Sequence, residues 1–330
     1  MLHGNAAVAA ATPGASQLVR VSSAARALNI VGDRWSLLIL YAAFSGETRF
    51  DAFQKLTGMA RSILADRLKR LEEARVLHRR KYQDRPARYE YLLTRAGVGL
   101  YPAALAVLGW EKRWHYDPDL RSHRLVHSTC GRTFTPTMVC GACRQPVTAR
   151  DVSLVDGPGA GMEPGPKARL QRRSTLASSP LPEDSGTQLH PMIERSIDIL
   201  GDRWTTHTIA AAFYGCRRFT EFQSALKAGT NILADRLALL VRRGVLVKTQ
   251  YQTRPARWEY RLTPEGLDLF PIIAAMMAWG DEWLSGDQGV PEILVHKSCG
   301  QPMKPLMVCD QCKDPAYAST TRLPGEDRSG

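Results

Sequence analysis

The spacing of apolar residues changes along the first third of the chain, and this change predicts its secondary structure. Residues 61–74 carry apolar positions at i, i+4 and i+7, which is the stripe of an amphipathic helix: Leu64, Leu68 and Leu71. Residues 78–82 and 88–93 are instead β-prone, and Pro86 between them favours a hairpin. Further helices are predicted over residues 24–31, 35–44, 51–56 and 95–114.

Short motifs fix the ends of two of these helices. Gly32 followed by Asp33 reads as the end of one helix and the N-cap of the next, and we expect Trp35 to enter the core. A binding role for this motif is the alternative. On the last helix, Trp110 and Trp114 share one face, which predicts burial in the core or in a dimer interface rather than a ligand platform.

Almost the whole pattern occurs twice at a constant offset. Asp33-Arg34-Trp35 recurs as Asp202-Arg203-Trp204, and residues 63–68 recur as residues 232–237, always 169 positions later. Two long copies without a net gap indicate a duplicated domain rather than a solenoid of short repeats. A function assigned to one copy must therefore be tested against the other.

The order of elements predicts a mainly α fold with a small β wing. We expect two winged helix-turn-helix domains, each followed by a small Cys-rich, zinc-ribbon-like extension. The predicted divisions are a disordered start (1–20), a first winged domain (21–118), a first extension (119–155), a flexible Gly/Pro/Ser-rich linker (156–189), a second winged domain (190–287), a second extension (288–319) and a disordered tail (320–330).

A winged helix-turn-helix places one helix in the DNA major groove and brings the hairpin to the backbone or minor groove. The groove-facing and flanking candidates of the first copy are Arg61, Ser62, Asp66, Arg67, Lys69 and Arg70, and its wing candidates are Arg85 and Arg88. The candidates of the second copy are Thr230, Asn231, Arg236, Arg254 and Arg257. Each of these also has a structural alternative; for example, Asp66 and Arg70 are spaced for an ion pair along the helix.

Several of these motifs, in this order, resemble the HxlR family of bacterial winged-helix transcriptional regulators. The resemblance rests on residues 32–35, Arg49-Phe50 with Phe53-Gln54, residues 63–68, and the run from Tyr82 to Thr94. It covers residues 21–114 and again 190–283, and implies sequence-specific DNA binding, usually by a homodimer. The chain departs from the family pattern in its two copies, in its Cys-rich extensions, and in lacking Cys at residues 21–24, ahead of the first helix.

Charge distinguishes the copies. The net charge is +12, and residues 21–150 hold 22 basic against 11 acidic residues, whereas residues 190–319 hold 15 against 14. The partner is therefore expected to be double-stranded DNA, with the first copy dominating phosphate contacts and the second reading a weaker half-site or serving as a dimerisation partner. The tandem copies could act as an intramolecular pseudo-dimer or within a homodimer, and the sequence identifies no small-molecule effector.

Six of the seven cysteines, with two histidines, form a repeated ligand pattern. A tetrahedral Zn²⁺ accepts such a Cys3His set, so we expect two structural zinc sites, one in each extension, from His127, Cys130, Cys140 and Cys143, and from His296, Cys299, Cys309 and Cys312. A redox- or electrophile-responsive thiol pair and inert cysteines remain alternatives. The seventh cysteine, Cys216, lies beside Arg217 and Arg218, which could lower its pKa, although an incidental thiol is the simpler interpretation.

Other classes of protein fit the sequence less well. No apolar run reaches the roughly 18 residues of a membrane span, and the start lacks a basic segment, so a cytoplasmic, nucleoid-associated location is expected. An enzyme is not expected, because the Cys and His residues have ligand spacing without an open position. The remaining alternatives are a regulator whose DNA binding is controlled by the Cys clusters, and a zinc-ribbon module for protein interaction.

Overall fold

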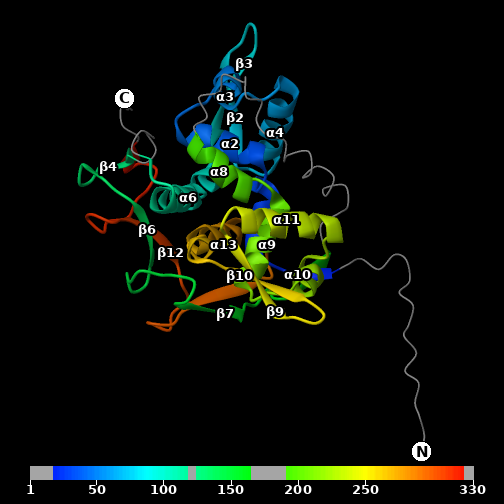
Figure 1. Ribbon diagram of the computed structural model, residues 1–330. Coiled ribbons are helices and arrows are strands. Elements are labelled where there is room, and N and C mark those ends of the chain that lie inside the picture. The colour runs from blue at the N-terminus through cyan, green and yellow to red at the C-terminus, as the bar shows by residue number, and fades with distance from the viewer. Residues whose placement is uncertain (1–17, 118–123, 165–190, 323–330) are drawn as a thin grey trace, which may run out of the picture.

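The computed structural model describes residues 18–117, 124–164 and 191–322 and contains the two expected winged helix-turn-helix units (Figure 1). The first consists of α1 (Ser23–Val31), α2 (Arg34–Phe44), α3 (Phe50–Thr57), α4 (Arg61–Glu73), β2 (Leu77–Gln83), β3 (Arg88–Leu93), α5 (Arg95–Val98) and α6 (Tyr101–Trp114). The second consists of α8 (Pro191–Leu200), α9 (Arg203–Phe213), α10 (Phe219–Leu226), α11 (Thr230–Arg242), β9 (Leu246–Gln252), β10 (Arg257–Leu262), α12 (Pro264–Leu267) and α13 (Phe270–Leu284).

The predicted helix 95–114 is wrong in one respect, since it is two helices. Thr94 caps α5 by accepting the backbone N–H of Gly97, and α6 begins anew with Pro102 in its first turn. Proline has no N–H to donate to the preceding turn but fits the start of a helix. Gly97 also contacts the backbone of Val76 so closely that a Cβ would lie 2.2 Å from the Val76 carbonyl oxygen. The predicted single helix is therefore interrupted at residues 99 and 100.

The Gly-Asp-Arg-Trp motif has the structural role predicted for it. Asp33 accepts the backbone N–H groups of Trp35 and Ser36, and Asp202 accepts that of Thr205. Trp204 is fully buried, whereas Trp35 is only half-buried. The caps explain why the motif occurs at the same place in both copies.

Each capping carboxylate also holds the long helix of its own helix-turn-helix. Arg67 on α4 lies 3.3 Å from Asp33, and Arg236 on α11 lies 2.6 Å from Asp202. The Asp202–Arg236 pair is nearly buried, with side-chain exposures of 10% and 11%, whereas the Asp33 side chain is 31% exposed. Since both charges are desolvated only in the second copy, the pair there is the more costly one to break.

The two copies pack against each other through their first and last helices. Helix α13 lies along α1 and α6, while α8 contacts α2 and α6. The indole N–H of Trp110 donates to the Glu265 carbonyl, and at the equivalent position that of Trp279 donates to the Ala96 carbonyl. The predicted burial of Trp110 in an interface is thus confirmed. Trp114, by contrast, lies at the margin of the interface and is 37% exposed.

The interface is asymmetric at its centre. Gly280 of α13 approaches α1 so closely that a Cβ would lie 2.3 Å from the Ser23 carbonyl oxygen. The equivalent residue of α6 is Glu111, which is buried and accepts a hydrogen bond from the hydroxyl of Ser196 on α8. One side of the interface therefore has close backbone packing, and the other has a buried carboxyl group.

The segments after each winged domain exchange strands. Strand β6 (Pro136–Cys140) pairs antiparallel with β12 (Pro305–Cys309), with the equivalent residues Met138 and Met307 opposite each other. Strand β7 (Val152–Asp156) pairs with β11 (Glu292–His296), and β13 (Thr321–Arg322) pairs with β4 (Val126–His127), which also pairs with β5 (Arg132–Thr133). The prediction of one self-contained extension per copy is therefore wrong, because β4, β6 and β7 of the first copy each pair with a strand of the second.

Ordered structure also extends into segments expected to be disordered. Strand β1 (Leu18–Arg20) pairs with β8 (Met162–Pro164), and the backbone N–H of Gly157 donates to the Pro291 carbonyl. The start, the linker and the tail therefore each contribute residues to strands, because backbone pairing compensates for their weak apolar pattern. The rest of these three predicted segments, residues 1–17, 165–190 and 323–330, lies outside the described residues.

The two wings project from opposite ends of the molecule, and α4 and α11 lie on one side while β6 and β12 lie on the other (Figure 1). The exchanged strands are thus remote from both candidate recognition helices. No single helix among the described residues is long and apolar enough to cross a membrane, although α1 and α2 together, bent by 82°, meet that criterion by length and composition.

Replacing Asp202 by Ala removes a cap and leaves Arg236 in a site without its carboxylate. We expect the free energy of unfolding to fall by about 3 kcal/mol, measured from the shift in urea midpoint. The matched variant Asp33→Ala should cost about 1 kcal/mol, typical of a lost cap, because the Asp33–Arg67 pair is longer and more exposed. Equal losses would contradict this difference.

The buried carboxyl of Glu111 predicts a pH-dependent stability. Burial raises its pKa to about 7, and the Ser196 hydrogen bond opposes this only in part. Since the folded state favours the protonated carboxyl, the stabilisation is complete below the unfolded pKa and is lost as pH rises through about 7.

We expect stability to fall by about 3 kcal/mol between pH 5 and pH 8, and Glu111→Gln to flatten this slope because it is neutral throughout. Urea unfolding at each pH measures both. An unchanged slope in the variant would assign the effect to other groups.

Candidate nucleic-acid interface and Cys/His clusters

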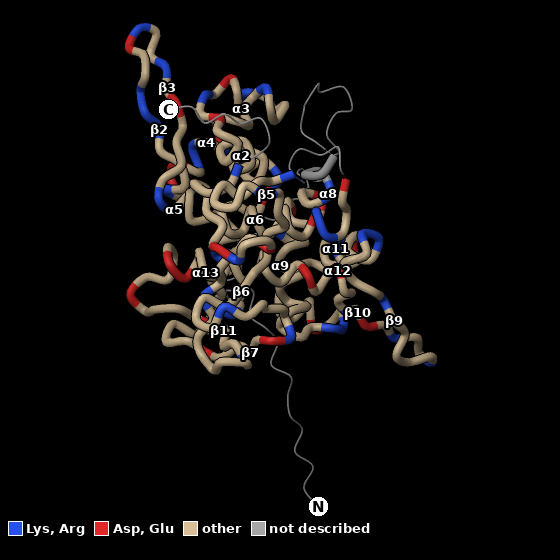
Figure 2. Tube along the Cα trace, turned by 90° about the vertical axis from the view of Figure 1, so that its left-hand side faces the viewer, with Lys and Arg blue, Asp and Glu red and all other residues tan. Residues whose placement is uncertain are grey.

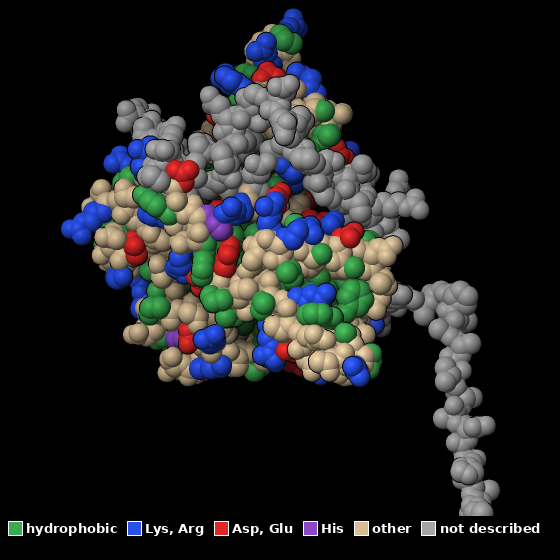
Figure 3. Space-filling model, viewed as in Figure 1, with side chains coloured by type: hydrophobic (Ala, Val, Ile, Leu, Met, Phe, Trp, Pro, Cys, Tyr) green, Lys and Arg blue, Asp and Glu red, His purple; other side chains and the backbone are tan. Residues whose placement is uncertain are grey.

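The solvent face of α4 presents most of the residues predicted for the first copy. Exposed on it are Arg61, Ser62, Asp66 and Lys69, and Arg85 and Arg88 are exposed at the wing. Figure 2 shows Lys and Arg along both strands of the β2–β3 hairpin, and Figure 3 shows basic side chains gathered over its tip. The helix and the wing together form a basic surface of the kind that contacts a phosphate backbone.

Short-range contacts orient these side chains without burying them. The Arg61 guanidinium lies 3.6 Å from Asp51 and 5.1 Å from the centre of the Phe50 ring. Asp66 and Arg70 form the expected i, i+4 pair at 3.1 Å. Exposed pairs of this kind contribute little stability, so the cations can exchange their carboxylate partners for phosphates.

Two of the residues predicted to contact DNA face the protein's interior. Arg67 and Arg236 turn inward to Asp33 and Asp202, with side-chain exposures of 13% and 11%. Helical periodicity explains this, because each lies three residues after a buried leucine, Leu64 or Leu233, and so borders the buried face. In this position each arginine ties its recognition helix to the capping carboxylate.

The corresponding surface of the second copy is less basic. Thr230 and Asn231 are exposed, and the Thr230 hydroxyl accepts a hydrogen bond from Gln223 at 3.1 Å. Arg254 and Arg257 are exposed on the second wing, as their equivalents are on the first. Exposed cations are thus missing from both elements of the second copy: Ala238 replaces Lys69 on the helix, and Thr249 and Gln250 replace Arg80 and Lys81 on the wing.

Sequence reasoning missed a row of cations along the first wing. Arg79, Arg80 and Lys81 are all exposed on β2, and each is paired with a carboxylate: Glu72, Glu90 and Asp84. The signal was present as an uninterrupted basic run at residues 79–81. Alternation, the usual mark of a strand with one buried face, is absent here, because the strand is exposed on both faces from His78 to Tyr82.

The cysteines and histidines form two compact clusters. One contains His127, Cys130, Cys309 and Cys312, and the other contains Cys140, Cys143, His296 and Cys299. Within each cluster, the four ligand atoms all lie within 4.8 Å of one another. The predicted residues are thus brought together, but the predicted grouping is wrong, since each cluster takes one His-x2-Cys pair from one copy and the Cys-x2-Cys pair of the other.

The pairing of β6 with β12 causes this exchange. Cys140 and Cys309 end these two antiparallel strands, so each Cys-x2-Cys turn is carried across to the other copy. The His-x2-Cys turns follow β4 and β11, which pair with strands of the opposite copy in the same way. Spacing along the sequence could not distinguish the two groupings, because both satisfy the same ligand count.

The separations fit four ligands around one ion. Tetrahedral zinc with Zn–S near 2.3 Å and Zn–N near 2.0 Å places its ligands about 3.5 to 3.8 Å apart. The Cys130 and Cys309 sulfurs are 3.9 Å apart, and Nδ1 of His127 lies 3.2 Å from the Cys312 sulfur. In the other cluster Nδ1 of His296 lies 3.3 Å from Cys143 and 3.4 Å from Cys299. A disulfide bond, near 2.05 Å, is not formed.

Groups around the first cluster act on its ligands in different directions. Nε2 of His127 lies 3.3 Å from the Pro315 carbonyl, and donation to that oxygen leaves Nδ1 free to accept a metal. A hydrogen bond from the Arg132 backbone lowers the pKa of Cys130 to about 7, whereas burial raises the pKa of Cys309 to about 11. Nε2 of His296 is buried without such a partner among the described residues. Each cluster could thus hold a metal ion, with the imidazole better oriented in the first.

Cys216 does not have the environment of a reactive thiol. Burial raises its pKa, and the negative charge of Glu221 raises it further. The neighbouring Arg217 and Arg218 direct their backbone N–H groups to that same carboxylate. The hypothesis of an activated thiolate at this position is therefore wrong.

Two helix-turn-helix units with basic wings define a DNA-binding transcriptional regulator. The chain belongs to the family described as HxlR-like helix-turn-helix, whose pattern matches residues 30–118 and again 199–288, more than half of the chain. The expected resemblance and the tandem duplication are thereby confirmed. The family match does not extend to the cluster residues, which lie between residues 127 and 143 and between residues 296 and 312.

Proteins with similar sequences are also described as transcriptional regulators. A Mycobacterium tuberculosis protein described as an uncharacterized HTH-type transcriptional regulator is 39% identical over 134 residues, which is 40% of this chain and 85% of that protein. One from Bacillus subtilis with the same description is 32% identical over 99 residues, covering 30% of this chain and 92% of that protein. Among solved structures, diamide-treated YodB from B. subtilis is 27% identical with a TM-score of 0.26, over 29% of this chain and 96% of YodB.

Proposed function

We propose that the two copies act as one intramolecular pseudo-dimer that reads two unlike half-sites in double-stranded DNA. Helices α4 and α11 would each enter a major groove, and the β2–β3 and β9–β10 wings would contact the adjacent backbone or minor groove. The reciprocal packing of α6 against α13 carries the proposal, because it fixes two DNA-reading units within one chain. This activity would take place at the nucleoid.

The first copy would supply most of the affinity. Its candidate surface combines Arg61 and Lys69 on the helix with Arg85 and Arg88 on the wing. The second keeps only the wing cations of that set, Arg254 and Arg257, and offers the uncharged Thr230 and Asn231 on its helix. Since phosphate neutralisation supplies much of protein–DNA affinity, the second unit would bind more weakly while still reading base edges.

We further propose that each Cys/His cluster binds one structural Zn²⁺. Three sulfurs and one imidazole nitrogen form a closed tetrahedral set that suits zinc. Both ions would join the copies, because each would take two ligands from each copy. Zinc would therefore fix the relative orientation of α4 and α11 from the far side of the molecule, and its loss by chelation or thiol oxidation would weaken DNA binding indirectly.

A protein-interaction role for the Cys/His region alone is the rival function. The exposed cations on both α4 and β2 favour DNA, because a module that used its winged helices only for protein contacts would not need them. Binding to DNA bearing the protein's own promoter, in a gel shift with excess nonspecific competitor, discriminates the two functions.

The asymmetry of the copies can be tested with matched variants. Arg61, Lys69, Arg85 and Arg88 are replaced together by Ala in one protein, and Thr230, Asn231, Arg254 and Arg257 in another. We expect the first to abolish binding near 0.15 M salt and to reduce the salt slope by about 3 to 4, and the second to weaken binding more mildly. Fluorescence anisotropy across a salt series measures both quantities.

Arg150→Ala with Lys304→Ala serves as the control, because both cations are exposed away from the helix-turn-helix units. Its affinity should stay within a few-fold of the parent. Equal losses of DNA affinity in the two quadruple variants would contradict the proposed asymmetry of the copies. Unchanged DNA binding in the first variant would rule out the proposed DNA-binding surface.

Two double variants distinguish exchanged from self-contained zinc sites. Cys143→Ser with Cys299→Ser removes ligands from a single exchanged cluster, so one zinc per chain should remain. Cys130→Ser with Cys143→Ser removes one ligand from each exchanged cluster, so both ions should be lost.

Metal analysis of the purified chains measures the stoichiometry, with two zinc ions expected for the parent. Self-contained sites would give the opposite result, with no zinc in the first variant and one in the second. Less than about one zinc per parent chain would remove the zinc proposal altogether and leave the DNA-binding proposal standing.

A further inference from the structure

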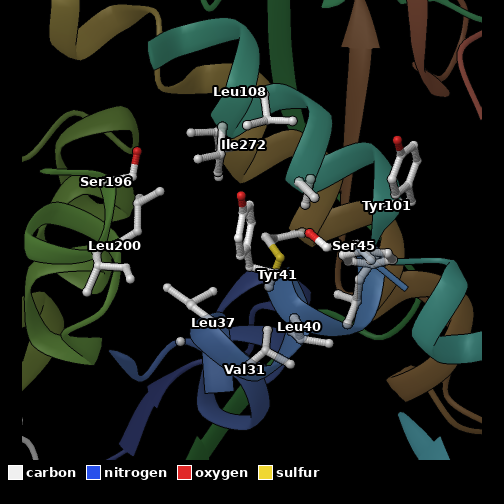
Figure 4. Close-up of a pocket in the computed structure, with 18 of the residues that line it drawn as sticks. Val31, Leu37, Leu40, Tyr41, Ser45, Tyr101, Leu108, Ser196, Leu200 and Ile272 are labelled. Atoms are coloured by element: carbon white, nitrogen blue, oxygen red, sulfur yellow. The ribbon is translucent and has the colours of Figure 1, made fainter. Parts of the chain in front are cut away.

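An apolar cavity lies where the two copies meet, and its lining includes neither the DNA-binding candidates nor the Cys/His ligands. Its walls come from α1, α2 and α6 of the first copy and from α8 and α13 of the second. Figure 4 shows side chains from these helices converging on it, with Tyr41, Leu108 and Ile272 around its centre. The cavity volume is about 160 Å³.

The lining selects for a neutral, compact molecule. Most of the lining side chains are aliphatic or aromatic, and the hydroxyl of Tyr101 is already bonded to that of Thr321. Ser196 is likewise engaged, since its hydroxyl donates to Glu111. Among the lining residues only Arg322 is charged, and it is exposed to solvent. A charged ligand inside the cavity would therefore lose hydration, and the one charged lining side chain, Arg322, lies at the solvent-exposed margin.

The volume of the cavity further restricts the class of ligand. An apolar cavity of about 150 Å³ lined by Leu, Ile and Phe holds benzene. The cavity here is of similar size and includes an aromatic wall, in which the Phe44 and Tyr101 rings meet edge to face at 5.1 Å. A single aromatic ring with at most a small uncharged substituent matches both its volume and its surface.

The second copy has a smaller counterpart of this cavity. It is lined by the equivalent part of that copy, including Phe213, Tyr214 and Ile273, and its volume is about 120 Å³. Tyr214 takes the place of Ser45, and its hydroxyl donates to Glu292 at 2.7 Å. Ile273 takes the place of Ala104.

Some residue differences between the two sites enlarge the first cavity and others reduce it, but in sum the first cavity is the larger. Tyr41 in the first site corresponds to the smaller Ala210 in the second, and this exchange alone would reduce the first cavity. The small side chains of Ser45 and Ala104 more than offset it. An empty apolar cavity lowers the stability of the fold. A larger cavity at one of two equivalent positions is therefore better explained by ligand binding than by packing.

We propose that the first cavity binds a neutral single-ring aromatic molecule, and that this molecule is an effector of the regulator. The second part rests on the proposed DNA-binding function. Helix α2 forms one wall of the cavity, and it also packs against α3, α4 and α8. A ligand between α2 and α8 therefore acts on the contact that sets one DNA-reading unit against the other.

Binding is tested on the full chain without DNA, using toluene and phenol as ligands and benzoate as the charged control. Ligand-observed NMR and thermal denaturation should show saturable binding of the two neutral rings, with a Kd below about 1 mM, and none of benzoate. No saturable binding of either neutral ring, or equally tight binding of benzoate, would overturn the proposal.

Variants that introduce residues of the second copy into the first locate the site. Ala104→Ile makes such a change and should weaken toluene binding at least tenfold by filling the cavity, whereas Leu108→Met, nearly equal in volume, should leave it within a few-fold. If Ala104→Ile does not fold, Ser45→Tyr fills the cavity from the opposite helix. Unchanged binding in the folded filling variant would place the ligand elsewhere and overturn the assignment.

The effector role has a separate readout. Toluene at saturation should change the affinity for promoter DNA several-fold in the parent chain and not in the cavity-filling variant. Unchanged DNA affinity in the ligand-saturated parent would overturn the effector role. Loss of DNA binding without any ligand would instead count against the proposed function, and the two failures are thus distinguishable.

Discussion

The antiparallel pairing of β6 with β12 is the constraint on which the rest of the structure depends. It places equivalent residues, Met138 and Met307, opposite each other, so the two copies are related by an approximate twofold at that point. Trp110 and Trp279 follow the same approximate twofold, because they donate to equivalent carbonyls across the interface. Strand exchange and helix packing therefore specify one mutual arrangement, and the Cys/His clusters follow from it.

Local elements were predictable because local chemistry decides them. The leucine stripe of α4, the Asp33 and Asp202 caps, and the turn before the wing all follow from residues a few positions apart. The break before α6 was missed because the apolar pattern continues across it, although Pro102 provided the signal. The inward orientation of Arg67 and Arg236 was not predicted, because the charge of an arginine on a recognition helix suggests a DNA contact. The helical position of each arginine, next to the buried face, indicates the ion pair instead.

Pairing between copies was not predictable in the same way. A duplicated sequence contains every ligand set twice, so His127 and Cys130 find a complete partner pair in either copy. Only the strand register chooses between them, and register over five-residue strands depends on tertiary contacts. The same reason explains β1 and β8, whose pairing depends on backbone groups far apart in the sequence.

Linking the copies covalently also changes what mutation can do to the interface. In a homodimer each substitution appears on both sides of the twofold. A buried carboxyl such as Glu111 would then be introduced twice, and the equivalent position could not be a glycine, as Gly280 is here. Within one chain the two positions are independent, and the tether keeps the partners at a high effective concentration even when their contacts become unequal. Close packing at Gly280, the carboxyl at Glu111 and the unequal cavities can therefore coexist. The same independence lets α4 keep Lys69 while α11 has Ala238, so divergence of the DNA-binding surfaces and of the interface has one physical origin.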